Sequence, residues 1–327
     1  MSKYFFLIVS AMLFCCALPA SLTAQAPPRR EIAITIDDLP AGNANNMTAA
    51  DITAMTKKLL ATLREQHILA VGFVNERKLY KPGEVDERIA ALAMWLDNGL
   101  ELGNHTFGHA SLNNVPLPAW EEEVIRGEVV TKTLLAQHHM RMRYFRHPYL
   151  DTGRDLQTRR VAEAFLAQRG YQIAPITLDA WDWMYAGVYD DARKRGDLAL
   201  QNQLVSSYLA HTAEVCDYFE KLSRDLLGYE PKQILLLHGN WLEADHIGEL
   251  LDLLRKRGYN FVTLQDALSD SAYSLPDEYV GPEGCGWLEH WAITRGKPPL
   301  NAPIFPQWVI DKAAALPKPA PEPQIYY

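Results

Sequence analysis

The sequence has few cysteines, and this shortage narrows the classes of protein it can be. Only four of its 327 residues are Cys, and Cys15 and Cys16 stand in an apolar leader. The remaining Cys216 and Cys285 are too few for a scaffold held together by disulfides. They could form one bridge, but Cys216 lies in an apolar helical stripe, so we expect a buried thiol there.

The sequence also lacks an excess of basic residues. It contains 32 Lys and Arg against 40 Asp and Glu, for a formal net charge of −8. Proteins that bind nucleic acid neutralise phosphates with basic surfaces, so this composition argues against a nucleic-acid partner. There are no internal repeats and no low-complexity tracts. With 48% hydrophobic residues, the chain can bury a full core as one α/β barrel or as two smaller domains.

The apolar leader is the one long hydrophobic run that stands out. Lys3 precedes apolar residues 4–20, and a small-residue sequence follows at 24–26. This pattern is typical of a secretory signal peptide, and Pro19 cuts the run short of a comfortable membrane span. We predict cleavage after Ala26, a secreted or periplasmic chain with 31 basic and 40 acidic residues, and no stable membrane insertion after cleavage.

Short apolar runs alternate with stretches of helical periodicity along the rest of the chain. Strands are predicted at 31–37, 71–75, 100–104, 142–145, 171–178, 233–237 and 260–264. Helices are predicted at 48–66, 85–98, 117–139, 156–169, 198–227 and 244–256. This alternation predicts an α/β fold with a parallel sheet. We expect residues 27–268 to form a distorted (β/α) barrel of about seven parallel strands.

Beyond residue 268 the periodicity fades into a sequence rich in Pro and Gly. We expect residues 269–327 to form an irregular C-terminal extension that wraps over the barrel, with a short helix at 287–294 and a partly flexible end at 316–327. Trp287, Trp291 and Trp308 could build a sugar-stacking surface or anchor the extension to the barrel, and we expect anchors.

Five of the predicted strands end in polar groups that can do chemistry. In chain order these groups are Asp37 with Asp38, His105, Arg146, Asp179 and His238. Catalytic residues collect at the carboxyl ends of the strands in α/β barrels. The two adjacent carboxylates repel each other, so a cation or a shared proton is expected beside them. A solvated turn that caps a helix is the alternative for this pair.

A metal site is predicted from the histidines of the third strand end. His105 and His109 are close enough in sequence to converge on one ion, and Gly108 between them favours a loop. This spacing alone is common on ordinary helices. Together with a carboxylate from the Asp pair, the two imidazoles form a three-ligand zinc set that leaves positions for water and substrate.

Five motifs in this order resemble those of the polysaccharide deacetylase family, carbohydrate esterase family 4. They are Thr-Ile-Asp-Asp at 35–38, His-Thr-Phe-Gly-His at 105–109, Arg-His-Pro-Tyr at 146–149, Asp-Ala-Trp-Asp-Trp at 179–183 and Leu-Leu-His at 236–238. The chain departs from the family around the aspartates, where the family has Phe before the pair and Gly after it. Ile36 and Leu39 stand at these positions, and we expect the bulky Leu39 to narrow the site.

The resemblance implies a role for each motif residue. Asp38, His105 and His109 would bind a divalent metal, with zinc the expected ion. Asp37 would be the general base and His238 the general acid.

The resemblance also implies supporting residues. Arg146 would keep Asp37 ionised, and the backbone N–H of Tyr149 would donate to the oxyanion. Asp182, or failing that Asp179, would orient His238. Trp183 and Leu236 would form the apolar wall around the acetyl methyl group.

The function implied is a metal-dependent hydrolytic deacetylase whose partner is an N- or O-acetylated poly- or oligosaccharide. One alternative is an amidohydrolase of the same superfamily that acts on a small non-peptide C–N amide, which the leader disfavours. Another is a catalytically silent carbohydrate-binding protein. Such a protein should have lost a ligand, the base or the acid, and none of these is missing from the motifs.

Other conspicuous residues are expected to be structural. His138 and His139 end a predicted helix, and His67, His211 and His246 belong to no motif. The three glutamates at 121–123 read as the solvated, acidic start of a helix.

Overall fold

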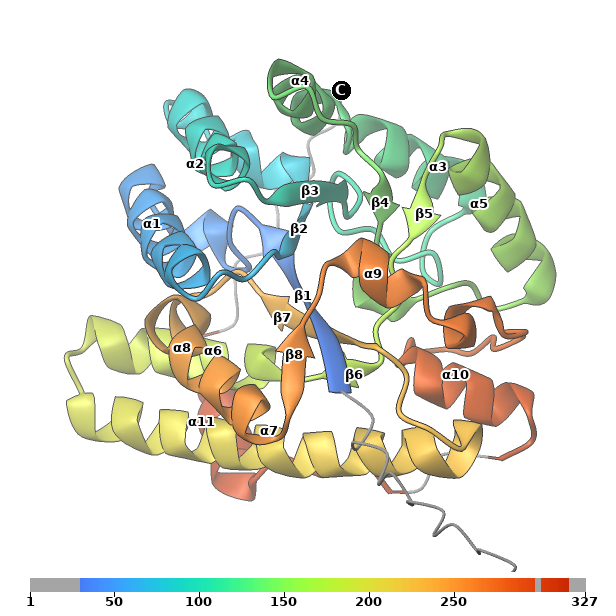
Figure 1. Cartoon of the computed structure of the whole chain (residues 1–327). Helices are drawn as coiled ribbons and strands as arrows, with labels where there is room; N and C mark the ends of the chain where they lie inside the picture. Colours follow the sequence, from blue (N-terminus) through green and yellow to red (C-terminus); the bar gives the residue numbers. More distant parts are fainter. Residues whose placement is uncertain (1–29, 298–300, 318–327) are drawn as a thin grey trace, which may run out of the picture.

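The computed structural model describes residues 30–297 and 301–317. The predicted signal segment at 1–26 lies outside these ranges, as does most of the end for which flexibility is predicted. Within them the strands curl into a half-barrel that is surrounded by helices (Figure 1). This confirms the predicted distorted (β/α) barrel. None of the helices in the described ranges is long and apolar enough to cross a membrane.

Strand β1 is the centre of the sheet. The strands are β1 (Arg30–Leu39), β2 (Val71–Val74), β3 (Glu101–Asn104), β4 (Tyr144–Phe145), β5 (Gln172–Ile173), β6 (Leu178–Asp179), β7 (Gln233–His238) and β8 (Tyr259–Phe261). All pairings are parallel, and the order across the sheet is β5-β4-β3-β2-β1-β7-β6, with β8 paired to the start of β1. The β-branched Ile32, Ile34 and Ile36 are buried, as expected for a strand covered on both faces.

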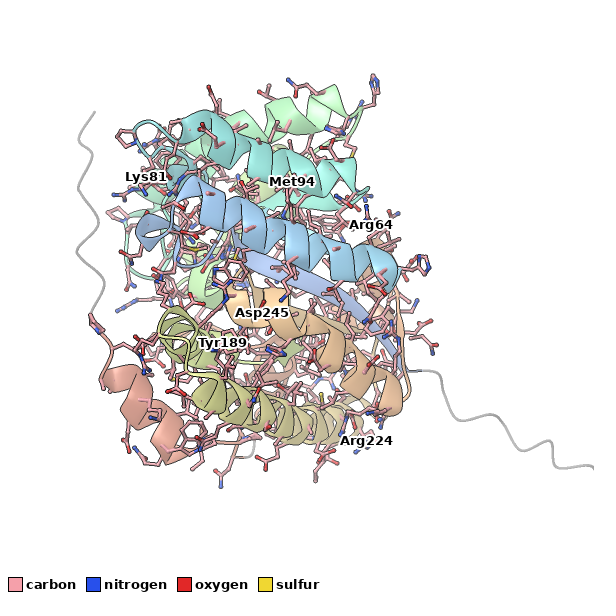
Figure 2. All side chains as sticks on the ribbon, turned by 90° about the vertical axis from the view of Figure 1, so that its left-hand side faces the viewer. Arg64, Lys81, Met94, Tyr189, Arg224 and Asp245 are labelled. Carbon is pink, nitrogen blue, oxygen red and sulfur yellow. The ribbon has the colours of Figure 1, made fainter. Side chains whose placement is uncertain are left out.

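Most of the predicted helices form close to their expected bounds. They are α1 (Ala49–Glu65), α2 (Val85–Asp97), α5 (Leu156–Gln168), α7 (Leu198–Leu227) and α8 (Trp241–Lys256). Thr48 caps α1 through a capping box with Asp51, which confirms the start of that helix. Figure 2 shows α1 and α8 on the face turned to the viewer, where the Tyr189 hydroxyl of α6 (Asp182–Lys194) donates to Asp245 of α8 at 2.8 Å. Helix α6 was not predicted, and neither were α9 (Leu264–Leu268) and α11 (Gln307–Ala314).

The predicted helix at 117–139 is wrong as a single helix. The chain forms α3 (Leu117–Arg126) and α4 (Val129–Gln137), with a break at Gly127. The backbone of Gly127 packs directly on the loop that follows β3, because an added Cβ would lie 2.7 Å from Phe107 N and from Thr106 C. The break therefore lets this loop approach the helix pair.

The predicted strand at 171–178 is also wrong as a single strand. Its two ends form β5 and β6, which lie at opposite edges of the sheet. Residues 174–177 cross from one edge to the other, and Pro175 in this crossing has no N–H for a strand ladder. Ala174 N–H still donates to Phe145 of β4, and Thr177 N–H donates to Ile234 of β7.

The C-terminal extension contains the predicted short helix, α10 (Trp287–Thr294), which packs beside α7 (Figure 1). Trp287 and Trp291 are buried in the main core, and Trp308 of α11 packs against it. This burial confirms that the tryptophans are anchors. Cys216 is a buried free thiol as predicted, and Cys285 is also free.

Gly127→Ala tests the contact between the helix break and the loop after β3. The added methyl group would clash with backbone atoms that cannot rotate away, so we expect the free energy of unfolding to fall by roughly 1–3 kcal/mol in urea denaturation. Gly248→Ala in α8 is the matched control, since its Cβ would make ordinary contacts of 3.4 Å or more. Helix propensity predicts that the control is neutral or slightly stabilised. Equal stability of the two variants would contradict the close packing at Gly127.

Candidate functional site

A cavity of about 740 Å³ lies at the carboxyl ends of the strands. It is lined by residues of all the predicted motifs: Asp37, Asp38, His105, His109, His147, Tyr149, Asp179, Trp181, Trp183, Leu236 and His238. Strand pairing brings them together, since Asp37 lies opposite His238 in the register of β1 and β7. Likewise Asn104 lies opposite Phe145, which places His105 beside Arg146.

Asp38, His105 and His109 form a cluster that could hold a metal ion. One ligand atom from each residue lies within 4.8 Å of the others. The Nδ1–H of His105 donates to the carbonyl of Arg146 at 2.8 Å, which leaves Nε2 as the ligand atom. Burial lowers the pKa of His105 well below its usual value, so the ring is neutral, as a metal ligand must be.

Asp38 is held ionised by neighbouring cations. Burial alone would raise the pKa of Asp38. The charges of Lys78 and His109 lower it by more than burial raises it, so the net shift is strongly downward. The Lys78 Nζ lies 3.1 Å from Asp38 Oδ1, and the His109 Nε2 lies 3.5 Å from the same oxygen. The backbone of Asp38 is left-handed, with φ of 69°. A charged carboxylate with two imidazoles is the donor set of a zinc site, so the residues fit a divalent ion.

The loop of the two histidines is held by residues outside the motif. Asn75 donates to the carbonyl of His105 at 2.6 Å, and the Gly108 N–H donates to Glu123 at 2.6 Å. Glu123 was predicted to be part of a solvated helix start, and that prediction is wrong. Its backbone carbonyl also accepts from the Phe107 N–H, so α3 supports this loop directly.

Asp37 has different partners from its neighbour Asp38. Its Oδ1 accepts from the buried guanidinium of Arg146 at 3.0 Å. Burial raises the pKa of Asp37, Arg146 and His238 oppose the rise, and the result is about 6. The carboxylate is thus ionised at neutral pH and more basic than an exposed Asp, which suits proton transfer.

Asp182, rather than the alternative candidate Asp179, contacts the His238 ring. Asp182 accepts from the ring Nδ1–H of His238 at 2.8 Å and from its backbone N–H at 3.0 Å. Asn240 donates to the same carboxylate at 2.6 Å. Asp179 instead accepts from the backbone N–H of Trp181. Burial lowers the pKa of His238, but the charge of Asp182 and its hydrogen bond outweigh this and raise it to about 10.

Comparison with known proteins gives a family match for part of the chain. Residues 24–173 match the model of the polysaccharide deacetylase family, a stretch that contains the first three motifs. The resemblance to this family is confirmed. A search of curated protein sequences found no match.

Several solved structures are similar to the chain. A chitin deacetylase from the fungal pathogen Colletotrichum lindemuthianum is 20% identical, with 77% of this chain and 93% of that chain covered and a TM-score of 0.50. A peptidoglycan deacetylase from Bacillus subtilis is 20% identical, with 74% and 93% covered and a TM-score of 0.45. A family 4 pseudoenzyme from Bacillus anthracis is 16% identical, with 75% and 67% covered and a TM-score of 0.46. At these identities the likeness concerns the fold.

The third motif of the polysaccharide deacetylase family forms a strained turn beside the histidines. Tyr149 and Leu150 both have left-handed backbones, with φ of 57° and 58°. The Tyr149 ring is 62% exposed and meets the His109 ring edge-on at 4.3 Å between centroids. Tyr149 and Leu150 of this turn line the cavity together with the residues of the metal-site cluster.

The apolar residues Trp183 and Leu236 of the fourth and fifth motifs line the cavity. Trp183 is half exposed at the rim, and Leu236 is buried. The expectation that Leu39 narrows the site is wrong. Leu39 is 1% exposed, and its side chain fills the space over Gly72 and Gly239 in the core instead.

Part of the cavity wall was missed in the sequence. Residues 282–286 and Glu289 of the C-terminal extension line the cavity together with the family motifs. Phe305 also packs against Trp181 and Trp183, with centroids 5.4 and 5.9 Å apart. The three glycines within residues 281–286 were the sequence signal that could have indicated this wall, because closely spaced glycines mark close approaches of the backbone.

Asp182→Asn tests the cause of the raised pKa of His238. Because the Asp182 charge is the main cause that raises it, we expect the pKa to fall in an NMR titration of the His238 ring. A raised His pKa stabilises the fold below its unfolded value of 6.5, and this contribution disappears as the pH rises to about 10. The variant should therefore lose less stability between pH 6.5 and 10 than the wild type.

Asp191→Asn is the matched control for that titration. Asp191 lies on the same helix, α6, but pairs with Arg195 at the surface. It should leave the pKa of His238 unchanged. A pKa of about 10 in Asp182→Asn would assign the shift to another group.

Proposed function

We propose that the protein is a metal-dependent hydrolase that removes acetyl groups from an acetylated poly- or oligosaccharide. The observation that carries this proposal is the separation of the two neighbouring carboxylates. Asp38 clusters with His105 and His109, and His109 Nε2 lies 3.5 Å from its Oδ1. Asp37 pairs with Arg146 through Oδ1 and lies opposite His238, and its other oxygen is 3.6 Å from His105 Nε2. One carboxylate is thus arranged as a ligand and the other as a base, as the family resemblance implies.

Asp38, His105 and His109 would hold the metal ion. We propose zinc, because one carboxylate and two imidazoles are a common catalytic zinc set. A divalent ion there would make water more acidic and polarise the acetyl carbonyl. The carbonyl of Arg146 fixes the tautomer of His105 for this purpose.

The chain's own residues would move the protons. Asp37, with a pKa of about 6, would accept the proton of the attacking water. The Tyr149 N–H would donate to the oxyanion as charge develops there. His238, with a pKa of about 10, is protonated at neutral pH and would donate its proton to the departing nitrogen or oxygen. Asp182 would hold the His238 ring in place for this transfer.

We further propose that the protein is exported. The leader at residues 1–26 has the charge, the apolar run and the small-residue end of a signal peptide. Export would bring the enzyme to cell-surface or extracellular glycans.

The roles of the two aspartates can be separated by substitution. Asp38→Ala removes one of three ligands, so zinc content should fall sharply, and excess zinc should restore part of the activity. Asp37→Asn is nearly isosteric and leaves the ligand set whole, so zinc should stay bound while most acetate release disappears. Elemental analysis and acetate release from acetylated glycans measure both. Zinc loss in Asp37→Asn with retention in Asp38→Ala would reverse the assignment, and wild-type acetate release from both would remove the pair from the mechanism.

His238→Asn tests the general acid. We expect a loss of about 10² to 10⁴ in rate on an N-acetyl substrate, with the zinc content unchanged. An acetyl ester with a good leaving group should lose less, because such a group departs without protonation. An equal loss on both substrates would argue against the acid role.

A further inference from the structure

The C-terminal extension forms one wall of the substrate cavity. We call residues 282–286 together with Glu289 the extension wall. Helix α10, which carries Glu289, packs beside α7, and the chain before it reaches the motif turn at Tyr149 (Figure 1). The family match ends at residue 173, so this wall belongs to a part of the chain that the match leaves out.

The extension wall is packed tightly against the barrel. Gly284 lies against the backbone of Tyr149 and Leu150 with no room for a Cβ. Its N–H donates to Asp151, which is part of the same turn. Asn113 donates to the carbonyl of Gly281 at 3.0 Å. The wall is therefore fixed to the turn beside the metal-site cluster.

A buried ion pair secures the start of the extension. Asp277 accepts from Arg159 of α5 at 2.7 Å and from His290 of α10 at 2.9 Å. The His290 ring is stacked between Tyr279 and Trp287, with centroids 4.3 and 4.5 Å apart. A wall held at both ends can impose its charge on a substrate at a fixed distance.

The extension wall adds two carboxylates to a cavity whose described lining contains no Lys or Arg. Glu283 and Glu289 join Asp37, Asp38, Asp151 and Asp179 among the lining residues, and none of the described lining residues is Lys or Arg. The nearby Arg146 and Lys78 are already paired with Asp37 and Asp38. The protonated His238 is likewise paired with Asp182. A divalent ion would add positive charge at Asp38, His105 and His109, so the charge of Glu283 and Glu289 acts on the part of a substrate that lies along the extension wall.

Glu289 lines the cavity, and each of its carboxylate oxygens has one donor within the protein. It accepts from the Gly286 N–H at 3.1 Å and from the Tyr218 hydroxyl at 3.4 Å. Burial raises the pKa of Glu289, and these two donors oppose the rise. Carboxylate oxygens accept hydrogen bonds from sugar hydroxyls but repel a sugar carboxylate.

We propose that the extension wall selects uncharged acetylated sugars and disfavours acetylated sugars that carry a carboxylate. This inference rests on the proposed deacetylase function and adds the charge class of its substrate. The residues that discriminate are Glu283 and Glu289, which contact substrate rather than the reacting atoms.

The test compares two substrates of equal length. One is a tetramer of N-acetylglucosamine, and the other is a tetramer in which alternate sugars carry a lactyl carboxylate. We expect the wild type to prefer the uncharged tetramer in kcat/KM by about tenfold or more, the scale of one like-charge contact. In Glu283→Gln with Glu289→Gln, the preference for the uncharged tetramer, expressed as the ratio of the two kcat/KM values, should fall about tenfold.

Glu278→Gln is the matched control. Glu278 is exposed on the same extension but does not line the cavity, so its substitution should change neither value. Glu283→Gln alone alters an exposed side chain and should show part of the effect even if the double variant folds poorly. An unchanged substrate ratio in both wall variants would overturn the inference.

Binding to Asp37→Asn separates this inference from the proposed function. Calorimetry with the two tetramers measures charge preference without turnover. If the wild type releases acetate from neither tetramer, the proposed function fails for these glycans. The ratio of the affinities of Asp37→Asn for the two tetramers then tests the charge selection by the extension wall on its own. A preference for the uncharged tetramer that disappears with Glu283→Gln and Glu289→Gln supports the inference, and equal binding of both tetramers contradicts it.

Discussion

The repulsion between two adjacent carboxylates is the constraint on which the site depends. Asp37 and Asp38 end the central strand, and the chain gives each one its own cation. The buried guanidinium of Arg146 pairs with Asp37, while Lys78 and His109 lie beside Asp38. Burial raises the pKa of Asp37 to about 6 against the opposing charge of Arg146, whereas Lys78 and His109 outweigh burial and shift the pKa of Asp38 strongly downward. Two residues of the same type can thus serve as base and ligand.

Arg146 connects this pair to the rest of the barrel. Its guanidinium donates to Thr35 and Asp37 on β1 and to the carbonyls of Ala174 and Pro175 in the crossing between β5 and β6. Its own carbonyl accepts from His105. One buried side chain therefore links Asp37, His105 and the open side of the half-barrel, and burial among these acceptors holds it in a single orientation.

The C-terminal extension completes the cavity rather than only covering the barrel. Its tryptophans anchor it in the core, and the backbone at Gly284 reaches the strained turn of the third motif. This position places two further carboxylates, Glu283 and Glu289, in the lining of the cavity. The motifs that resemble the family contain the residues of the proposed chemistry, and a segment outside the matched stretch contains the carboxylates of the proposed substrate selection.

The sequence by itself determined most of the strands, their parallel arrangement and the polar residues at their carboxyl ends, because buried strands and helices have local periodicities and the motifs are contiguous. Asp37, His105 and His238 were found this way. Tertiary structure decided what depends on contacts between distant segments: the division of 171–178 into opposite edges, the break at Gly127, the inward packing of Leu39 and the choice of Asp182 over Asp179. The position of Glu289 in the cavity was decided there as well. No local pattern encodes these features, since each follows from which backbone or side chain approaches from elsewhere in the chain.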